Sequence, residues 1–286
     1  MELSGDTTER ERLKAMMNRY LQALEAHDLA SLQLGARLHY TENTRELPLG
    51  AGLARTIRGR KPGGHYFVDD EGGQVEYWGV IDEMGAAAIY GVRLRVEGRL
   101  ITEIETLVVR GGGSYFNPAV INEPVPTFHA EIPREERTVR GELIEIANLY
   151  FDAIEQSDGA RLPVTDQCRR LVNGVTDSRM DPSGLQAAEA HRALGVAEQM
   201  SARHYAYIEA LRARRFPIVD EVHGLVLSHV LFDHPGDLKR AGGAIPYRSP
   251  NSTLAFEVFK VRNRVLQEVW AIGTALPYGI DAGWPV

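Results

Sequence analysis

The sequence predicts an α+β fold made of two fused cone-like α+β barrel domains, in each of which helices pack on a curved antiparallel sheet. The first observation behind this prediction is that residues 18–43, an amphipathic helix and the segment after it, recur 130 positions later. Seven identities fall at this offset: Asn18 with Asn148, Tyr20 with Tyr150, Ala23 with Ala153, Glu25 with Glu155, Asp28 with Asp158, Leu32 with Leu162 and Asn43 with Asn173. Seven identities at one spacing indicate a duplication.

A second echo, at an offset of 165, relates residues 94–103 to residues 259–268. In the first of these segments Glu97 and Gly98 form a tight hairpin turn between two strands. A repeat this long means duplicated domains and not a solenoid, whose units run to about 20–50 residues. We therefore expect a first cone-fold domain over residues 1–112, a linker over 113–140 and a second cone-fold domain over 141–286.

Composition narrows the class of protein. The 286 residues are 44% hydrophobic and 25% charged, which is typical of a globular chain with enough residues for two cores. A net charge of −7 argues against a nucleic-acid partner, since phosphates are neutralised by basic surfaces. The polar N-terminus does not resemble a signal peptide, and no apolar run reaches 18 residues, so we expect a cytoplasmic protein without a membrane partner.

No cofactor or metal is expected. The single cysteine, Cys168, excludes an internal disulfide and a multi-thiolate site. The glycine-rich stretch between Leu47 and Gly64 matches no phosphate-binding pattern, and no H-x-H or H-E-x-x-H spacing occurs.

The first domain begins with a helix near Glu9, capped by Thr8 or Asp6. Residues 37–43 then alternate like a strand, which places Glu42 on one face with two apolar neighbours, Leu38 and Tyr40. A carboxylate in an apolar setting has a raised pKa and suits a general base or acid. The alternative is that Glu42 caps the following turn or pairs with an arginine.

Four strands follow the glycine-rich stretch, over residues 65–68, 73–82, 86–96 and 100–110. A helical start followed by an antiparallel meander is an α+β layout, with helices on one face of the sheet.

The segments TENTRELPLGAGL, GQVEYWGV and GRLITEIETLVVR resemble a tandem version of the nuclear-transport-factor-2-like cone fold. This family includes SnoaL-like cyclases, ketosteroid isomerases, scytalone dehydratase and formaldehyde lyases. The resemblance implies a general-base carboxylate near the end of the first strand, and the matching residue here is Glu42. It is specific for fold and weak for reaction, because this scaffold hosts many chemistries.

The second domain repeats the helix from Gly141 but has Val172 where the first has Glu42. The run 196–214 is predicted as a helix. The strand after it, residues 221–233, places His229 and Asp233 on one face among leucines. His229 and Asp233 are the other catalytic candidates, although a lone strand histidine is more often a hydrogen-bonded core residue.

Aromatic and basic side chains of the same elements are the substrate-binding candidates: Tyr20, Tyr40, Trp78, Arg93, Tyr150, Tyr205 and Trp284. Alternatively, Tyr20 and Tyr150 are core tyrosines whose hydroxyls are hydrogen-bonded. The apolar C-terminal tail, which carries Trp284, is expected to cover a pocket mouth or a subunit interface.

Together these features favour a cofactor-independent lyase that acts by acid/base catalysis on a small, mostly apolar, aromatic molecule. Dehydration, or retro-aldol cleavage that releases a small aldehyde such as formaldehyde, is the expected reaction. An isomerase or cyclase, or a non-catalytic binding or assembly module, are the alternatives, and the chain is a possible homo-oligomer.

Overall fold

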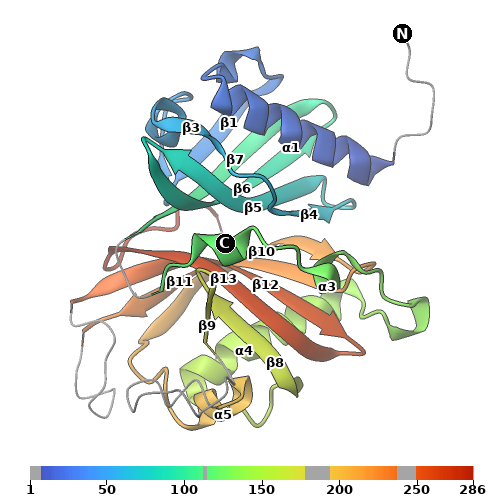
Figure 1. Ribbon diagram of the computed structural model, residues 1–286. Helices are drawn as coiled ribbons and strands as arrows, with labels where there is room; N and C mark the ends of the chain where they lie inside the picture. The colour runs from blue at the N-terminus through green and yellow to red at the C-terminus, as the bar shows by residue number, and fades with distance from the viewer. Residues whose placement is uncertain (1–7, 112–114, 178–193, 237–248, 286) are drawn as a thin grey trace.

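Two β-sheets and two long helices dominate the computed structural model, which describes residues 8–111, 115–177, 194–236 and 249–285 (Figure 1). The first unit contains α1 (Glu9–Glu25), η1 (Leu29–Ser31), β1 (Leu34–Glu42), β2 (Arg45–Glu46), η2 (Gly52–Arg55), β3 (Ile57–Arg60), β4 (His65–Asp69), β5 (Gln74–Glu83), β6 (Ala86–Glu97) and β7 (Leu100–Arg110). A connecting segment holds α2 (Pro118–Ile121), α3 (Pro126–His129) and η3 (Arg134–Glu136). The second unit contains α4 (Arg140–Gln156), β8 (Val164–Val172), β9 (Val175–Thr176), α5 (Val196–Ser201), β10 (Ala210–Asp220), β11 (Leu225–His234), β12 (Asn251–Arg262) and β13 (Val265–Pro277). The predicted α+β class is confirmed, whereas the exact domain limits stay a prediction.

Each unit is a sheet with a long helix on one face. The first sheet has the order β2-β1-β7-β6-β5-β3, with β4 also paired to β5, and the second has the order β10-β11-β12-β13-β8-β9. In both, the strand that follows the long helix runs parallel to the last strand of the unit, and the other pairings are antiparallel. The two units therefore share one connectivity.

The register confirms the duplication residue by residue. In β1 and β7, His39 pairs with Glu103, and in β8 and β13, Arg169 pairs with Glu268. The hairpin of the first unit pairs Arg95 with Glu103 just before a register shift, and that of the second pairs Lys260 with Glu268 just before an equivalent shift. Both sequence offsets, 130 and 165, are thus offsets of structurally equivalent positions.

Two asparagines hold the end of the first strand of each unit in the same way. The side chain of Asn43 donates to the carbonyl of Val108 at 3.1 Å and accepts from its N–H at 2.8 Å. The side chain of Asn173 makes the same two bonds to Gly273, at 3.0 and 2.8 Å. Both asparagines have a left-handed backbone, with φ of 48° and 49°, a conformation that asparagine tolerates better than most residues.

The helix α1 forms where the sequence predicts it. The Thr8 hydroxyl accepts from the N–H of Glu11, whose carboxylate accepts from the N–H of Thr8 in return, which is a complete capping box. The stripe that faces the sheet is buried and consists of Leu13, Met16, Met17, Tyr20, Leu21 and Leu24. In the second unit α4 packs on its sheet in the same manner.

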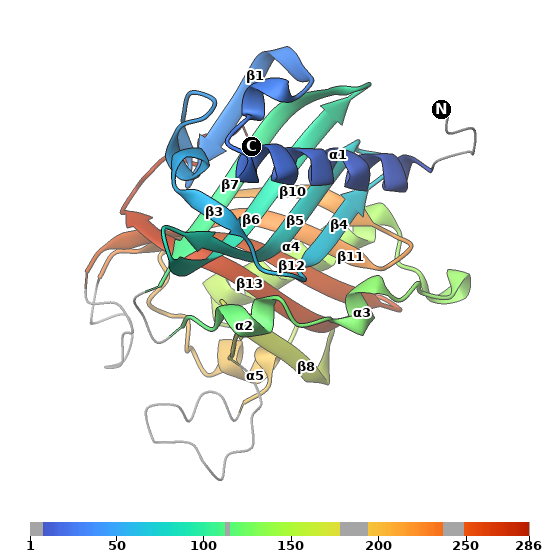
Figure 2. The same cartoon turned by 45° about the horizontal axis from the view of Figure 1, so that its top comes forward.

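The two sheets pack against each other through the faces turned away from α1 and α4. In Figure 1 the two helices lie on the outside of the pair of sheets, and in Figure 2 the strands of one sheet cross those of the other. The apolar layer between the sheets includes Trp78 and Leu107 of the first and Phe256 and Ile272 of the second. Gly91 permits the close approach, because a Cβ atom there would lie 2.7 Å from Cδ1 of Ile272.

The predicted helix over residues 196–214 is wrong beyond its first turns. Helix α5 ends at Ser201, and from Ala210 the chain forms β10, which pairs with β11. Arg203 has a left-handed backbone with φ of 62°, which breaks the helix. The helix preference of the alanines and arginines is overridden by the ladder that β10 gains with its neighbour.

The C-terminal tail crosses from the second unit to the first. The Trp284 indole N–H donates to the Thr41 hydroxyl at 2.9 Å, and the ring lies 3.9 Å from the ring of His39. The guanidinium groups of Arg93 and Arg215, one from each unit, lie over its ring. The tail thus covers the seam between the two units.

Candidate functional site

Glu42, at the end of β1, is a bound carboxylate. Its Oε2 accepts from the N–H of Leu53 at 2.7 Å, and its Oε1 lies 3.4 Å from Arg110. This is the arrangement described by the alternative above, a turn ligand paired with an arginine.

His229 lies between the two sheets, fully buried. Its Nε2 lies 3.0 Å from Oε2 of Glu76, its Nδ1 lies 3.1 Å from Oε2 of Glu105, and its ring stacks on Phe256 at 3.5 Å. Burial alone would raise the pKa of Glu105, but His229 and two arginines hold that pKa well below its usual range. These contacts of His229 with Glu76 and Glu105 connect the two sheets within the apolar layer between them.

Three further candidates belong to this same layer or to its edge. Arg93 is buried between Glu103 and Glu105, at 2.7 and 3.0 Å, and Trp78 donates its indole N–H to Glu76 at 2.6 Å. Trp284 covers the layer from outside, as described above. The structure thus brings Trp78, Arg93, Trp284 and His229 together, but between the units and not inside a cone.

Asp233, near the end of β11, is paired with Arg212 and accepts from the Ser252 hydroxyl at 2.6 Å. Burial would raise the pKa of Asp233, but these hydrogen bonds hold it below its usual value. Asp233 is therefore a bound carboxylate at neutral pH.

The interior of the first cone is packed with tyrosines. Tyr20, Tyr40 and Tyr90 are each at most 3% exposed, and the hydroxyls of Tyr20 and Tyr90 are hydrogen-bonded at 3.0 Å. Burial raises the pKa of all three phenols, so they stay neutral. Their rings give this cone a solid core.

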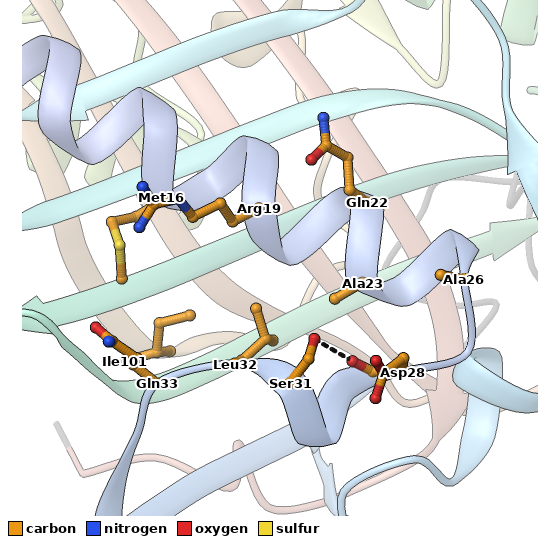
Figure 3. A pocket seen from close by; sticks show the side chains of 10 residues that line it. All are labelled: Met16, Arg19, Gln22, Ala23, Ala26, Asp28, Ser31, Leu32, Gln33 and Ile101. Carbon is orange, nitrogen blue, oxygen red and sulfur yellow. Dashed lines mark hydrogen bonds between the residues drawn. The ribbon is translucent and has the colours of Figure 1, made fainter. Parts of the chain in front are cut away.

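One hollow of the first unit lies at its surface. It is a groove of about 430 Å³ between α1, η1 and the starts of β1 and β7, shown in Figure 3. Its ionisable lining residues, Arg19 and Asp28, are both exposed, and Met16 and Ile101 form its apolar floor. Solvated charges on an open groove are poorly suited to proton transfer, which gains from desolvated groups.

The second cone is hollow. A cavity of about 140 Å³ opens among β8, β11, β12 and β13 on the side where α4 and α5 pack. Small residues line its sheet wall: Ala255, Ala271, Gly273 and Ala275. At the equivalent positions of the first unit the residues are Tyr90, Thr106, Val108 and Arg110, as the shared register shows. Loss of side-chain volume at these positions leaves the space.

A buried arginine network forms the polar side of this cavity. Arg170, on β8, donates from Nε to the Tyr150 hydroxyl at 2.8 Å and from Nη1 to Asp177 and to the Tyr205 hydroxyl. Tyr205 donates in turn to Gln199 at 2.6 Å. Burial alone would lower the pKa of Arg170, but the tyrosines and Asp177 raise it, so the guanidinium stays charged. Tyr150 and Tyr205 are the two sequence-predicted residues that the structure brings to this network.

Glu257, on β12, is a second buried carboxyl group at the cavity, besides Asp177. It is 2% exposed, and its Oε2 has no hydrogen-bond partner within the described part of the chain. Burial raises its pKa to about 7, and the nearby Arg170 moves the pKa only partly back. The equivalent residue of the first unit is Val92, a core side chain.

His234 completes the titratable lining. Its ring stacks on Tyr207 with centroids 5.2 Å apart, and burial lowers its pKa to about 4 against the opposing effect of Asp233. The imidazole is therefore neutral at physiological pH and can exchange hydrogen bonds with a polar ligand.

Sequence reasoning missed Glu257, Arg170 and Asp177 as site residues. A signal was present for the first of them. At the offset of 165 Glu257 replaces Val92 on a face that also carries Ala255 and Phe259, so a charge replaces an apolar residue inside a duplicated core. The position equivalent to Arg170 is Tyr40, which was singled out only in the first repeat.

The cavity offers two carboxyl groups, Glu257 and the arginine-paired Asp177, together with one guanidinium, phenols and an imidazole. Among the described residues no group of three or more histidine, cysteine or acidic side chains is placed to hold a metal ion. In the same part of the chain no helix is long and apolar enough to cross a lipid bilayer. The arrangement as it stands can accept and return a proton and stabilise negative charge on an oxygen atom.

Comparison with known proteins gives one family model and a set of similar solved structures. A family model described as a domain of unknown function (DUF8021) matches residues 136–273, from η3 into β13. No match was found among curated proteins. The chain is similar to the solved structure of the BvnE pinacolase from Penicillium brevicompactum, with 13% identity over 47% of this chain and 84% of that chain and a TM-score of 0.30.

Two further solved structures are similar at the same level. One is a nuclear-transport-factor-2-like protein of unknown function from Cytophaga hutchinsonii, with 15% identity over 37% of this chain and 94% of that chain and a TM-score of 0.28. The other is SalBIII, an epoxide hydrolase/cyclase-like enzyme of pyran ring formation in salinomycin, with 14% identity over 47% and 92% and a TM-score of 0.32. In its own element order and layers, each unit of this chain has the nuclear-transport-factor-2-like cone architecture.

Proposed function

We propose that the second cone is a cofactor-independent acid/base active site, and that the protein is a lyase for a small, mostly apolar, aromatic molecule. The observation that carries this proposal is Glu257, a carboxyl group with a pKa near 7, buried at a cavity whose equivalent in the first cone is solid. A general acid or base is most effective when its pKa lies near the working pH. Perturbed carboxyl groups in clefts are typical of catalytic sites.

The proposed step is an elimination. In a dehydration the Glu257 carboxylate takes a carbon-bound proton, the electrons of that C–H bond form the double bond, and the hydroxyl leaves as water with the proton that Glu257 returns. In a retro-aldol cleavage Glu257 takes the hydroxyl proton, the C–C bond breaks to release an aldehyde, and the proton returns to the carbon. Negative charge that builds on a substrate oxygen is stabilised by the Arg170 network.

The size and lining of the cavity support a small apolar substrate. An apolar cavity of about 150 Å³ holds one benzene ring. The cavity here is of similar volume, and its apolar lining includes Val172, Ile208 and Phe232. One ring with short substituents is therefore the expected size of substrate.

The first test compares turnover by matched carboxamide variants, one in each cone. Single-ring β-hydroxy ketones are incubated with the parent, with Glu257→Gln and with Glu42→Gln, and loss of water or release of aldehyde is followed by mass spectrometry. Loss of a general acid or base costs about 10²–10⁴-fold in rate. We expect such a loss for Glu257→Gln and a change of only a few-fold for Glu42→Gln.

The pH profile and the products decide between the proposal and its alternatives. Because the base must be ionised, the rate of the parent should rise with pH through a midpoint near pH 7 and level off above it. A product with the mass of the substrate would indicate an isomerase or cyclase. Ring compounds that bind but are never converted would indicate a binding module, and Glu257→Gln turning over like the parent would contradict the role of Glu257.

A further inference from the structure

The duplication supplies an internal template for the ligand of the second cone. Tyr90 of β6 and Ala255 of β12 are equivalent, because Tyr90 pairs with Val108 and Ala255 pairs with Gly273 at the same place in each hairpin. Tyr20 of α1 and Tyr150 of α4 are equivalent at the other offset. The second cone has therefore kept the helix tyrosine and lost the strand tyrosine that faces it.

In the first cone the strand tyrosine is a fully enclosed phenol. The Tyr90 ring is 0% exposed, and its hydroxyl meets that of Tyr20 at 3.0 Å. Burial raises the pKa of Tyr90 well above its usual value, so the enclosed group is a neutral phenol. One neutral ring with one hydroxyl thus fits the space between the sheet and the helix of this fold.

In the second cone the described residues leave a cavity at the position equivalent to Tyr90. Ala255 lines the cavity of about 140 Å³, next to Ala271 and Gly273. The Tyr150 hydroxyl is still in place and is held by Arg170 Nε at 2.8 Å, and Arg170 itself lines the cavity. A ligand hydroxyl at this end would meet a charged donor in place of the neutral Tyr20–Tyr90 pair, and a hydrogen bond to a charged group is the stronger one.

The charges of the lining residues that the structure describes favour a neutral ligand. The positive charge of Arg170 is balanced by its buried partner Asp177, and burial favours the uncharged form of Glu257. A carboxylate ligand would bring an unbalanced negative charge into a buried space, which is costly.

We propose that the second cone binds a neutral single-ring phenol, which lies at Ala255, where the first cone has Tyr90, and places its hydroxyl at Arg170. This inference rests on the proposed function in the same cavity and specifies its substrate class as hydroxyarenes. It makes Ala255 the residue that sets the available space.

The experiment measures binding of p-cresol, the free analogue of a tyrosine side chain, by calorimetry and by ligand-detected NMR. The parent should bind one p-cresol per chain. Toluene, which lacks the hydroxyl, should bind about tenfold more weakly, as should p-toluate, which carries a carboxylate. Ala255→Tyr, which restores the first-cone residue, should abolish binding, and Ala255→Val should weaken it without adding a polar group.

The Glu257→Gln variant separates this inference from the proposed function. It should keep p-cresol binding within a few-fold while losing turnover. If the parent itself binds p-cresol but turns over no substrate, the lyase proposal is contradicted and the phenol site is retained. Should Ala255→Tyr not fold, Ala255→Val with the toluene comparison still decides. Unchanged p-cresol affinity in the Ala255 variants, or equal affinity for toluene or p-toluate, would overturn the phenol site.

Discussion

The two cones of this chain share one arrangement of helix and strands, here called the frame, and differ in the side chains that fill its interior. Where the first carries Tyr40, Tyr90 and Val92, the second carries Arg170, Ala255 and Glu257. The first set makes a packed interior of rings and aliphatic groups. The second leaves a cavity with a buried guanidinium and a carboxyl group of raised pKa.

The proposed function would divide stability and chemistry between the two duplicated domains. A packed interior gains apolar burial without desolvating charge, whereas a hollow one with buried ionisable groups loses packing and must compensate those charges. Functional sites commonly carry such costs. The solid first cone packs sheet to sheet against the hollow second one.

The largest effect is expected from emptying the first cone. Tyr90→Ala should lower the free energy of unfolding by about 3–5 kcal/mol, the usual loss when a large buried ring is removed. Urea unfolding with and without p-cresol measures this loss, and p-cresol should restore part of it by filling the new space. A loss below about 1 kcal/mol would mean that Tyr90 does not fill the cone.

A smaller effect, with a defined pH dependence, is expected in the second cone. The pKa of Glu257 is about 7 in the folded protein and 4.5 in an unfolded chain, so the folded state holds its proton more tightly. Its contribution to stability is therefore present below pH 4.5 and is lost as the pH rises to about 7, an effect of about 3 kcal/mol.

Glu257→Gln should accordingly be more stable than the parent at pH 8.5, by up to about 3 kcal/mol, and similar to it at pH 4. Urea unfolding at the two pH values measures the difference, with Glu42→Gln as the matched control. Equal stabilities of parent and Glu257→Gln at both pH values would contradict the buried carboxyl group.

The smallest effect should be the same in both cones, since it concerns their shared frame. Asn43→Ala and Asn173→Ala each remove two equivalent side-chain hydrogen bonds and should each cost about 1–2 kcal/mol. Urea unfolding of the two variants checks this. Losses that differ by more than about 1 kcal/mol would show that the frames are not equivalent.

The frame could be predicted from the sequence, since repeats and alternation are properties of single positions. The offsets of 130 and 165 appear as structural equivalences, and the strands of the first unit lie close to where their alternation predicts them. The segment from Ala210 was misassigned as helix because its residues have helical preference and only the partner strand β11 reveals it as a strand.

The site could be predicted only in part. Tyr205 lines the cavity and Tyr150 contacts its Arg170, but His229 lies between the two sheets. Alternation placed His229 on a strand face among leucines, and alternation does not say what covers that face. The covering element here is the other sheet, 153 positions away in sequence at Glu76. Glu257 was visible only as a strand carboxylate, because its importance comes from the cavity that small residues on two strands create together.

We propose that the second cone, and not the first, holds a carboxyl group tuned for proton transfer. Titration of ¹³C-carboxyl-labelled glutamate by NMR tests this directly, with the parent, Glu257→Gln and Glu42→Gln measured side by side. One carboxyl resonance should titrate near pH 7 in the parent and in Glu42→Gln and be absent from Glu257→Gln. If every glutamate of the parent titrates below about pH 5.5, or if the high-pKa resonance disappears in Glu42→Gln instead, the claim is contradicted.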